Sequence, residues 1–135
     1  NAHLTYLGTQ LAHHGLEPAA NLVIRDNPED IAIFFSQAWQ RSDLIITTGG
    51  LGPTTDDITR ESIAKALGEE LIFDPIVELA LKDRFSQSGK PMPEINLRQC
   101  YRPENAEVLE NPFGTAQNGE QSEMVQERCA KLRIA

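Results

Sequence analysis

The sequence predicts an α/β protein with a mostly parallel sheet that is covered by helices on both faces. Short apolar runs alternate with segments whose apolar residues recur at helical spacing, a pattern typical of strand–helix–strand units. A loop with three glycines lies between one of these runs and the helix after it. Because open α/β sheets bind ligands where a strand passes into a helix, this loop is the first candidate for a site.

The chain begins with a predicted helix and a predicted strand. Leucines at i, i+3 and i+7 give the segment from Ala2 to His14 one apolar stripe, with Asn1 placed as its cap. Gly15 is suited to end this helix, because glycine accepts the left-handed conformation found there. The next apolar run, Asn21–Ile24, is predicted to be a strand.

A second helix follows, and polar residues and a proline mark its start. Asp26 or Asn27 is expected to cap it, with Pro28 in its first turn. Asp43–Ile46 then predicts the buried strand that enters the glycine loop. The apolar stripe of the second helix comprises Ile31, Phe34, Phe35, Ala38 and Trp39.

The second half of the chain predicts shorter elements. A helix from Arg60 to Leu67 leaves the loop, with Thr59 as its cap and Gly68 as its end. Residues that break regular structure separate the later elements. The later elements are expected to be a strand at Leu71–Phe73, a helix from Pro75, one or two helical turns over Ile95–Tyr101, an edge strand at Ala106–Leu109 and a terminal helix from Ser122.

Composition restricts the function classes. A chain of 135 residues is enough for one domain, which is expected to span residues 1–135. Its 20 acidic and 12 basic residues give a net charge of −8, which disfavours binding to nucleic acid or to acidic membranes. No apolar run has the length of a membrane span. Cys100 and Cys129 form no disulfide framework, so a cytoplasmic protein is expected.

The glycine loop, Thr47–Glu61, has the composition of an anion site. Glycines can take positive φ, and without a Cβ they let an anion approach the backbone N–H groups. Hydroxyls of Thr54 and Thr55 would add donors to a phosphate. The three glycines concerned are Gly49, Gly50 and Gly52.

Two adjacent acids make this loop unusual. Carboxylates beside a phosphate repel it unless a divalent cation lies between them, so Asp56 and Asp57 favour a site in which a metal bridges to the phosphate. The alternative is a tight turn in which the two acids accept hydrogen bonds from local backbone donors. From the residues alone both interpretations stay open. The loop matches neither the Walker A pattern nor the dinucleotide fingerprint.

At this point the sequence resembles a known family. The run Thr-Gly-Gly-Leu-Gly-Pro-Thr-x-Asp-Asp-x-Thr, from Thr48 to Thr59, looks like the signature of the MoaB/Mog-like molybdopterin-binding domain, in the form found in the CinA family of competence/damage-inducible proteins. Three further segments resemble that family in matching order, so the resemblance runs from the first residue to about Ala116. They are Asn1-Ala2, Asn96–Cys100 with Pro103, and Asn111–Ala116.

The resemblance implies a three-layer α/β/α fold and a small-molecule ligand, either a nucleotide or a pterin phosphate. It also implies hydrolysis of a pyrophosphate such as that of ADP-ribose with a divalent cation, Mg²⁺ or Co²⁺. Asp56 and Asp57 would be catalytic and hold the metal. The other implied contacts are phosphate binding by Gly49, Gly50 and Gly52, ligand orientation by Thr47, Thr48 and Thr55, a second anion contact by Gly114 and Thr115, and ribose or base recognition by Asn96 and Gln99.

Other functions stay open at this stage. The domain could be a non-catalytic module of molybdenum-cofactor metabolism that holds molybdopterin. It could also be an inactive truncated copy, or a subunit of a homo-oligomer, since the family domain has a first strand ahead of the position of Asn1 and a longer C-terminal part. The same loop would serve nucleotide and pterin ligands, so the sequence does not choose between them.

Overall fold

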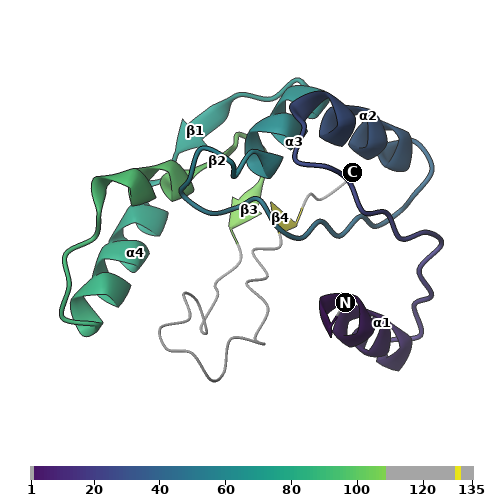
Figure 1. Ribbon diagram of the computed structural model, residues 1–135, viewed down its shortest axis with the longest axis horizontal. Coiled ribbons are helices and arrows are strands. Elements are labelled where there is room, and N and C mark those ends of the chain that lie inside the picture. The colour runs from purple at the N-terminus through teal and green to yellow at the C-terminus, as the bar shows by residue number, and fades with distance from the viewer. Residues whose placement is uncertain (1, 109–129, 132–135) are drawn as a thin grey trace. The chain divides into compact units, whose positions relative to one another are not determined.

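The computed structural model describes residues 2–108 and 130–131 (Figure 1). Residues 2–23 belong to one compact unit, and residues 24–108 with 130–131 belong to a second. The two units are considered separately. No helix within the described residues is long and apolar enough to cross a membrane.

The first unit contains α1 (Ala2–His13), which confirms the predicted helix to within one residue. Gly15 ends it in the left-handed region with a φ of 70°, as predicted. The Leu16 N–H donates to the carbonyl of Leu11 at 2.9 Å and satisfies one of the last helical carbonyls. Asn1, the predicted cap, lies outside the described residues.

The second unit is organised around α2 (Pro28–Trp39) and α3 (Thr59–Leu67), which lie side by side in Figure 1. Ile31 and Phe35 of α2 pack against Ile63 of α3, and all three are buried. Phe34 was predicted to share this apolar stripe, but it is 38% exposed. A helix of this length buries only the narrow face that meets its neighbour, so the edge of the predicted stripe stays in solvent.

Two predicted strands are not formed. Residues 21–24 and 43–46 are irregular chain in the described structure. Ile24 and Ile45 do pack against the α2–α3 core, so part of the predicted burial is present. A strand also requires a neighbouring chain to complete its backbone hydrogen bonds, and no such ladder joins these segments to a described residue.

The strands that do form pair in antiparallel ladders. β1 (Leu71–Phe73) confirms a predicted strand and pairs with β2 (Tyr101–Pro103). β3 (Glu107–Val108), within the predicted edge strand, pairs with β4 (Ala130–Lys131). The ladders among the described residues are thus two-stranded and antiparallel, in contrast to the mostly parallel sheet that was predicted.

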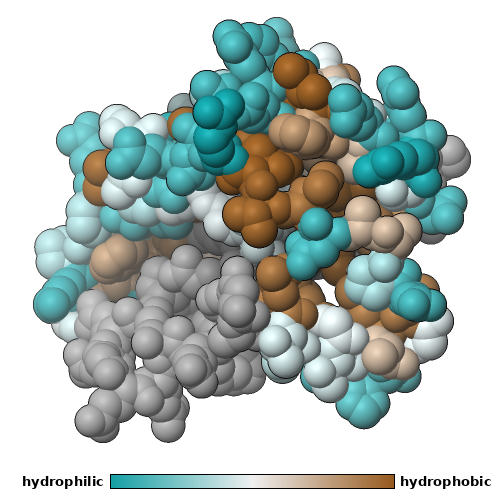
Figure 2. Space-filling model, turned by 45° about the vertical axis from the view of Figure 1, so that its right-hand side comes forward, coloured by the Kyte–Doolittle hydropathy of each residue, from teal (hydrophilic) through white to brown (hydrophobic). Residues whose placement is uncertain are grey.

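A second, smaller core lies between α4 (Pro75–Gln87) and the 3₁₀ helix η1 (Glu94–Cys100). Val77 and Leu81 of α4 pack against Cys100, which is completely buried. The opposite face of α4 exposes Ile76 (77%) and Leu79 (62%). On the face that Figure 2 shows, hydrophobic residues reach the surface between hydrophilic ones.

Candidate functional site

Two adjacent glycines in the left-handed region shape the loop, as predicted. Gly49 and Gly50 have φ values of 88° and 63°. The Thr59 N–H donates to the Gly50 carbonyl at 3.1 Å, which ties the loop to the first turn of α3. A Cβ on Gly50 would lie 2.2 Å from Thr59 Oγ1. Glycine is therefore required at position 50 by its backbone conformation and by its packing.

The start of α3 differs from the prediction. Thr59 is the first helical residue rather than the cap, and it is buried. Ile58 occupies the N-cap position and makes no side-chain capping hydrogen bond. Because the Thr59 N–H already reaches the Gly50 carbonyl, the loop backbone satisfies a donor of the first turn. The C-terminal prediction is confirmed, since Gly68 ends α3 with a φ of 69°.

Gly52 was predicted to share the positive φ of the other two glycines, but its role in the loop is different. It is not among the glycines with positive φ. A Cβ at Gly52 would lie 2.4 Å from Asp57 Oδ2, so the absent side chain makes room for that carboxylate. A side chain at position 52 would therefore displace the Asp57 carboxylate from its place in the loop.

Asp57 closes the loop on itself. Its Oδ2 accepts hydrogen bonds from the Thr54 N–H at 2.9 Å and from the Thr54 hydroxyl at 2.6 Å. Partial burial raises the pKa of Asp57, but the donors of Thr54 and Gly52 and the charge of Arg98 outweigh it and hold the pKa below its ordinary value. The Thr54 hydroxyl, expected to contact phosphate, is thus used inside the loop, as the turn interpretation of the two acids predicts.

Asp56 and Thr55 remain exposed at the tip of the loop. Asp56 makes no side-chain hydrogen bond to a described residue. Across residues 2–108 and 130–131, no group of three or more His, Cys, Asp or Glu side chains is placed to hold a metal ion. The predicted metal pair therefore consists of one free carboxylate and one whose Oδ2 already accepts two hydrogen bonds.

An arginine that the sequence patterns did not indicate contacts this loop. Arg98 of η1 donates through Nη1 to the carbonyls of Pro53, at 3.5 Å, and of Thr54. Its Nη2 donates to Glu61 Oε1 at 3.2 Å. The only signal in the sequence was a basic residue between Asn96 and Gln99, and nothing in that local pattern says which loop it would meet.

A second arginine shares the same carboxylate oxygen. Arg60 Nη2 lies 3.1 Å from Glu61 Oε1, and the Arg60 side chain is only 8% exposed. Arg60 Nε and Glu61 Oε2 are both buried without a hydrogen-bond partner among the described residues. Two guanidinium groups therefore face one carboxylate oxygen beside the loop, and Asp57 of the loop, whose pKa the charge of Arg98 helps to lower, supplies a second negative charge.

Asn96 and Gln99 share a face, as predicted, and both are buried. The Asn96 amide donates to Gln99 Oε1 at 2.9 Å, and the Gln99 amide donates to the Leu51 carbonyl at 3.4 Å. The pair is thus brought to the loop from η1, where it supports the backbone. Recognition of a ribose or base by these two amides stays a prediction.

The remaining predicted site residues are placed only in part. Thr47 is half-buried and Thr48 is exposed, both on the segment that leads into the loop. Gly114, Thr115 and Cys129 lie outside the described residues, as does the start of the terminal helix predicted from Ser122. Farther along, Ala130–Lys131 form strand β4 rather than helix. The structure therefore joins residues 47–57 with Asn96 and Gln99, and it leaves the second anion contact as a prediction.

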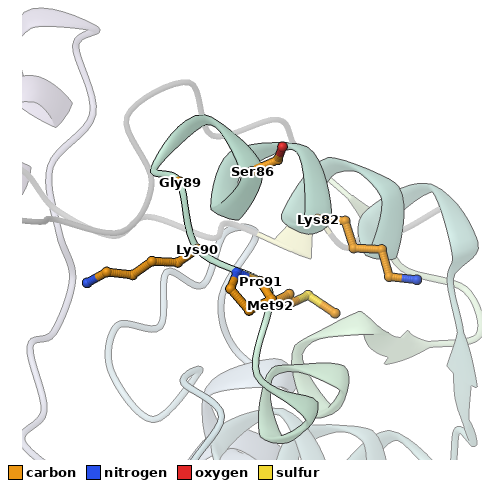
Figure 3. A pocket seen from close by; sticks show the side chains of 6 residues that line it. All are labelled: Lys82, Ser86, Gly89, Lys90, Pro91 and Met92. Carbon is orange, nitrogen blue, oxygen red and sulfur yellow. The ribbon is translucent and has the colours of Figure 1, made fainter.

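A separate cavity of about 420 Å³ lies between the end of α4 and the chain after it. Its lining includes Lys82, Ser86, Lys90 and Met92. Figure 3 shows the two lysine side chains extending in opposite directions rather than converging. Lys82 is also paired with Glu78 at 2.6 Å. None of the predicted site residues lines this cavity, so the glycine loop remains the candidate site.

Similarity to known proteins defines the class. A family profile described as "Probable molybdopterin binding domain" matches residues 1–127. The solved structure of the protein CinA from Thermoplasma acidophilum superposes with a TM-score of 0.76 at 32% identity, covering 86% of this chain and 68% of that one. The chain therefore belongs to the CinA family of molybdopterin-binding domains and has its α/β fold.

Curated relatives agree with this assignment. A "Putative competence-damage inducible protein" of Symbiobacterium thermophilum is 45% identical over 116 residues, which is 86% of this chain and 27% of the relative. A "CinA-like protein" of Kosmotoga olearia is 42% identical over 116 residues, which is 28% of its length. The chain thus spans about a quarter to a third of the length of these relatives.

Proposed function

We propose that the loop of residues 47–57 binds a phosphate group of a small nucleotide or pterin. The observation that carries this proposal is the consecutive pair Gly49 and Gly50, both at positive φ, with the Gly50 carbonyl bound by the Thr59 N–H in the first turn of α3. Backbone N–H groups in such a turn, together with a helix N-terminus, favour an anion.

The proposed reaction is hydrolysis of a pyrophosphate of the ADP-ribose type with a divalent cation. Mg²⁺ is commonly held by one or two carboxylates together with substrate phosphates and water, and the donor set of this loop fits that requirement. Asp56 would be the main ligand because its carboxylate is exposed, and Asp57 would contribute the oxygen that Thr54 does not occupy. When bound, the cation would supply Lewis-acid polarisation of a phosphoryl oxygen.

The chain's own residues would bind and orient the substrate. The N–H groups around Gly49 and Gly50 would hold the phosphate that carries the reacting phosphorus. Hydroxyls of Thr48 and Thr55, both exposed, are available as further donors. Attack of water on that phosphorus would break one P–O bond of the pyrophosphate and yield two phosphomonoesters.

The enzymatic proposal is tested by incubating the protein with ADP-ribose and Mg²⁺ or Co²⁺ and measuring the AMP that forms by chromatography. Asp56→Asn is expected to lower the rate at least tenfold, because it removes the free carboxylate while the loop hydrogen bonds of Asp57 remain. Asp26→Asn is the matched control, since Asp26 is exposed and lies on another loop. Absence of AMP from folded wild-type protein would remove the enzymatic function.

A non-catalytic pterin-binding function is the second candidate. One observation favours it: the matching family profile is described by molybdopterin binding. Calorimetry with a pterin phosphate and with ADP-ribose, each with and without chelator, separates the candidates. Pterin binding that is unaffected by chelator, without turnover of ADP-ribose, would favour this function. Self-association and a cytoplasmic location stay predictions.

A further inference from the structure

We propose that Arg98 is a positioning residue that holds the glycine loop in its ligand-binding shape, an inference that rests on the function proposed above. Arg98 lies 44 residues from Thr54 and 37 from Glu61 in the sequence, yet its guanidinium contacts both. It also reaches the Pro53 carbonyl at 3.5 Å. One side chain therefore joins the middle of the loop to the first turn of α3.

The geometry of a guanidinium suits this role. Its planar group presents several N–H donors in a rigid arrangement, so it can hold two carbonyls and a carboxylate at fixed relative positions. Thr54, whose carbonyl it contacts, is also the residue that donates twice to Asp57. Arg98 therefore acts on the loop through the same residue that closes it.

Glu61 shows why this contact is difficult to replace. Its Oε1 accepts from Arg60 and Arg98, and its Oε2 is buried without a partner among the described residues. Loss of Arg98 would leave this partly buried carboxylate with Arg60 alone, and it would remove a positive charge from beside the loop. Arg98→Lys keeps the charge but cannot reproduce the planar set of donors, so it isolates the positioning effect.

Arg102 provides a matched control four residues away. It pairs with Asp74 at 2.8 Å and donates to the carbonyls of Glu104 and Ala106, each at 2.9 Å. Its side chain is 28% exposed, against 36% for Arg98. Both arginines thus join a carboxylate to backbone carbonyls, but the partners of Arg102 lie outside the glycine loop.

The experiment compares Arg98→Lys and Arg102→Lys in the full chain. Amide hydrogen exchange is measured for peptides covering residues 47–58 and α4, and ADP-ribose affinity is measured by calorimetry. We expect Arg98→Lys to raise exchange in the loop while α4 is unchanged. We also expect it to weaken ADP-ribose binding about tenfold, because lysine cannot hold the loop carbonyls and Glu61 at the same time. Arg102→Lys is expected to leave the loop and the affinity unchanged.

Loop exchange equal to that of wild type in Arg98→Lys would overturn the proposal. An equal rise in the loop and in α4 would also overturn it, because Arg98 would then be a general stabilising residue. If wild-type protein binds no ADP-ribose, the proposed nucleotide ligand fails, while the exchange comparison still decides the role of Arg98. Arg98→Ala is the second variant, and it is expected to raise loop exchange further than Arg98→Lys.

Discussion

Gly50 shows how much a single residue determines in this site. Its φ of 63° favours glycine, and a Cβ there would lie 2.2 Å from Thr59 Oγ1. Gly68 has a closely similar φ of 69°, but a Cβ at that position would meet nothing within 4 Å. The two glycines therefore separate the energetic cost of the backbone conformation from the cost of steric contact.

Alanine substitution at these two positions is a direct test. Gly68→Ala is expected to lower the free energy of unfolding by about 1 kcal/mol, from the left-handed conformation alone. Gly50→Ala is expected to cost about 1–3 kcal/mol more, because overpacking against α3 adds to that penalty. Urea denaturation measures both values. Equal losses would show that Thr59 moves aside freely, contrary to this expectation.

At the scale of elements, α2 shows a helix start that local residues specify. Asn27 Oδ1 accepts hydrogen bonds from the N–H groups of Glu29 and Asp30, each at 3.0 Å. Pro28 follows the cap, at a position where its missing N–H costs nothing. Asn27 and Pro28, which helped to predict this helix start from the sequence, therefore occupy the cap and the first helical position in the structure.

Removal of the α2 cap should have a measurable cost. Asn27→Ala is expected to lower the free energy of unfolding by about 1 kcal/mol, because two helix-end donors lose their acceptor. Asp26→Ala is the control, and as an exposed residue without a capping role it should change stability by less than about 0.5 kcal/mol. Thermal or urea unfolding compares the two. Equal effects would indicate that water replaces the Asn27 side chain without loss.

At the scale of the whole molecule, two acids make stability depend on pH. Hydrogen bonding from Arg102, with the N–H groups of Ile76 and Val77, outweighs burial and lowers the pKa of Asp74. The donors of Thr54 similarly lower the pKa of Asp57. Both acids bind protons more readily in the unfolded chain, so their stabilising effect is complete above their ordinary pKa of 3.8 and is lost as the pH falls through the folded values.

Wild-type protein is therefore expected to lose stability as the pH falls from about 5 to below 4, the range in which an ordinary aspartate is protonated. Asp74→Asn should be less stable at neutral pH and should lose less on acidification. Asp83→Asn, at an exposed position of α4, is the control and should follow the wild-type curve. Urea unfolding at several pH values provides the measurement. If the free energy of unfolding changed with pH in the same way for Asp74→Asn and for wild type, Asp74 would not be the source of the acid sensitivity.

The sequence alone determined the local features of this protein. The structure confirms several features that follow from the chemistry of a few neighbouring residues: the glycines that end α1 and α3, the strand at residues 71–73 and the turn at Gly49 and Gly50. Of the two caps predicted for α2, Asp26 and Asn27, the structure selects Asn27. The run from Thr48 to Thr59 was also enough to indicate the family.

Only the tertiary structure decided how distant residues meet. It placed Arg98 and Gln99 on the glycine loop, and it left residues 21–24 and 43–46 without a ladder among the described residues. Local patterns record the propensity of a segment, but a strand needs a partner and a side chain needs an acceptor. Those partners lie tens of residues away, and only packing brings them together.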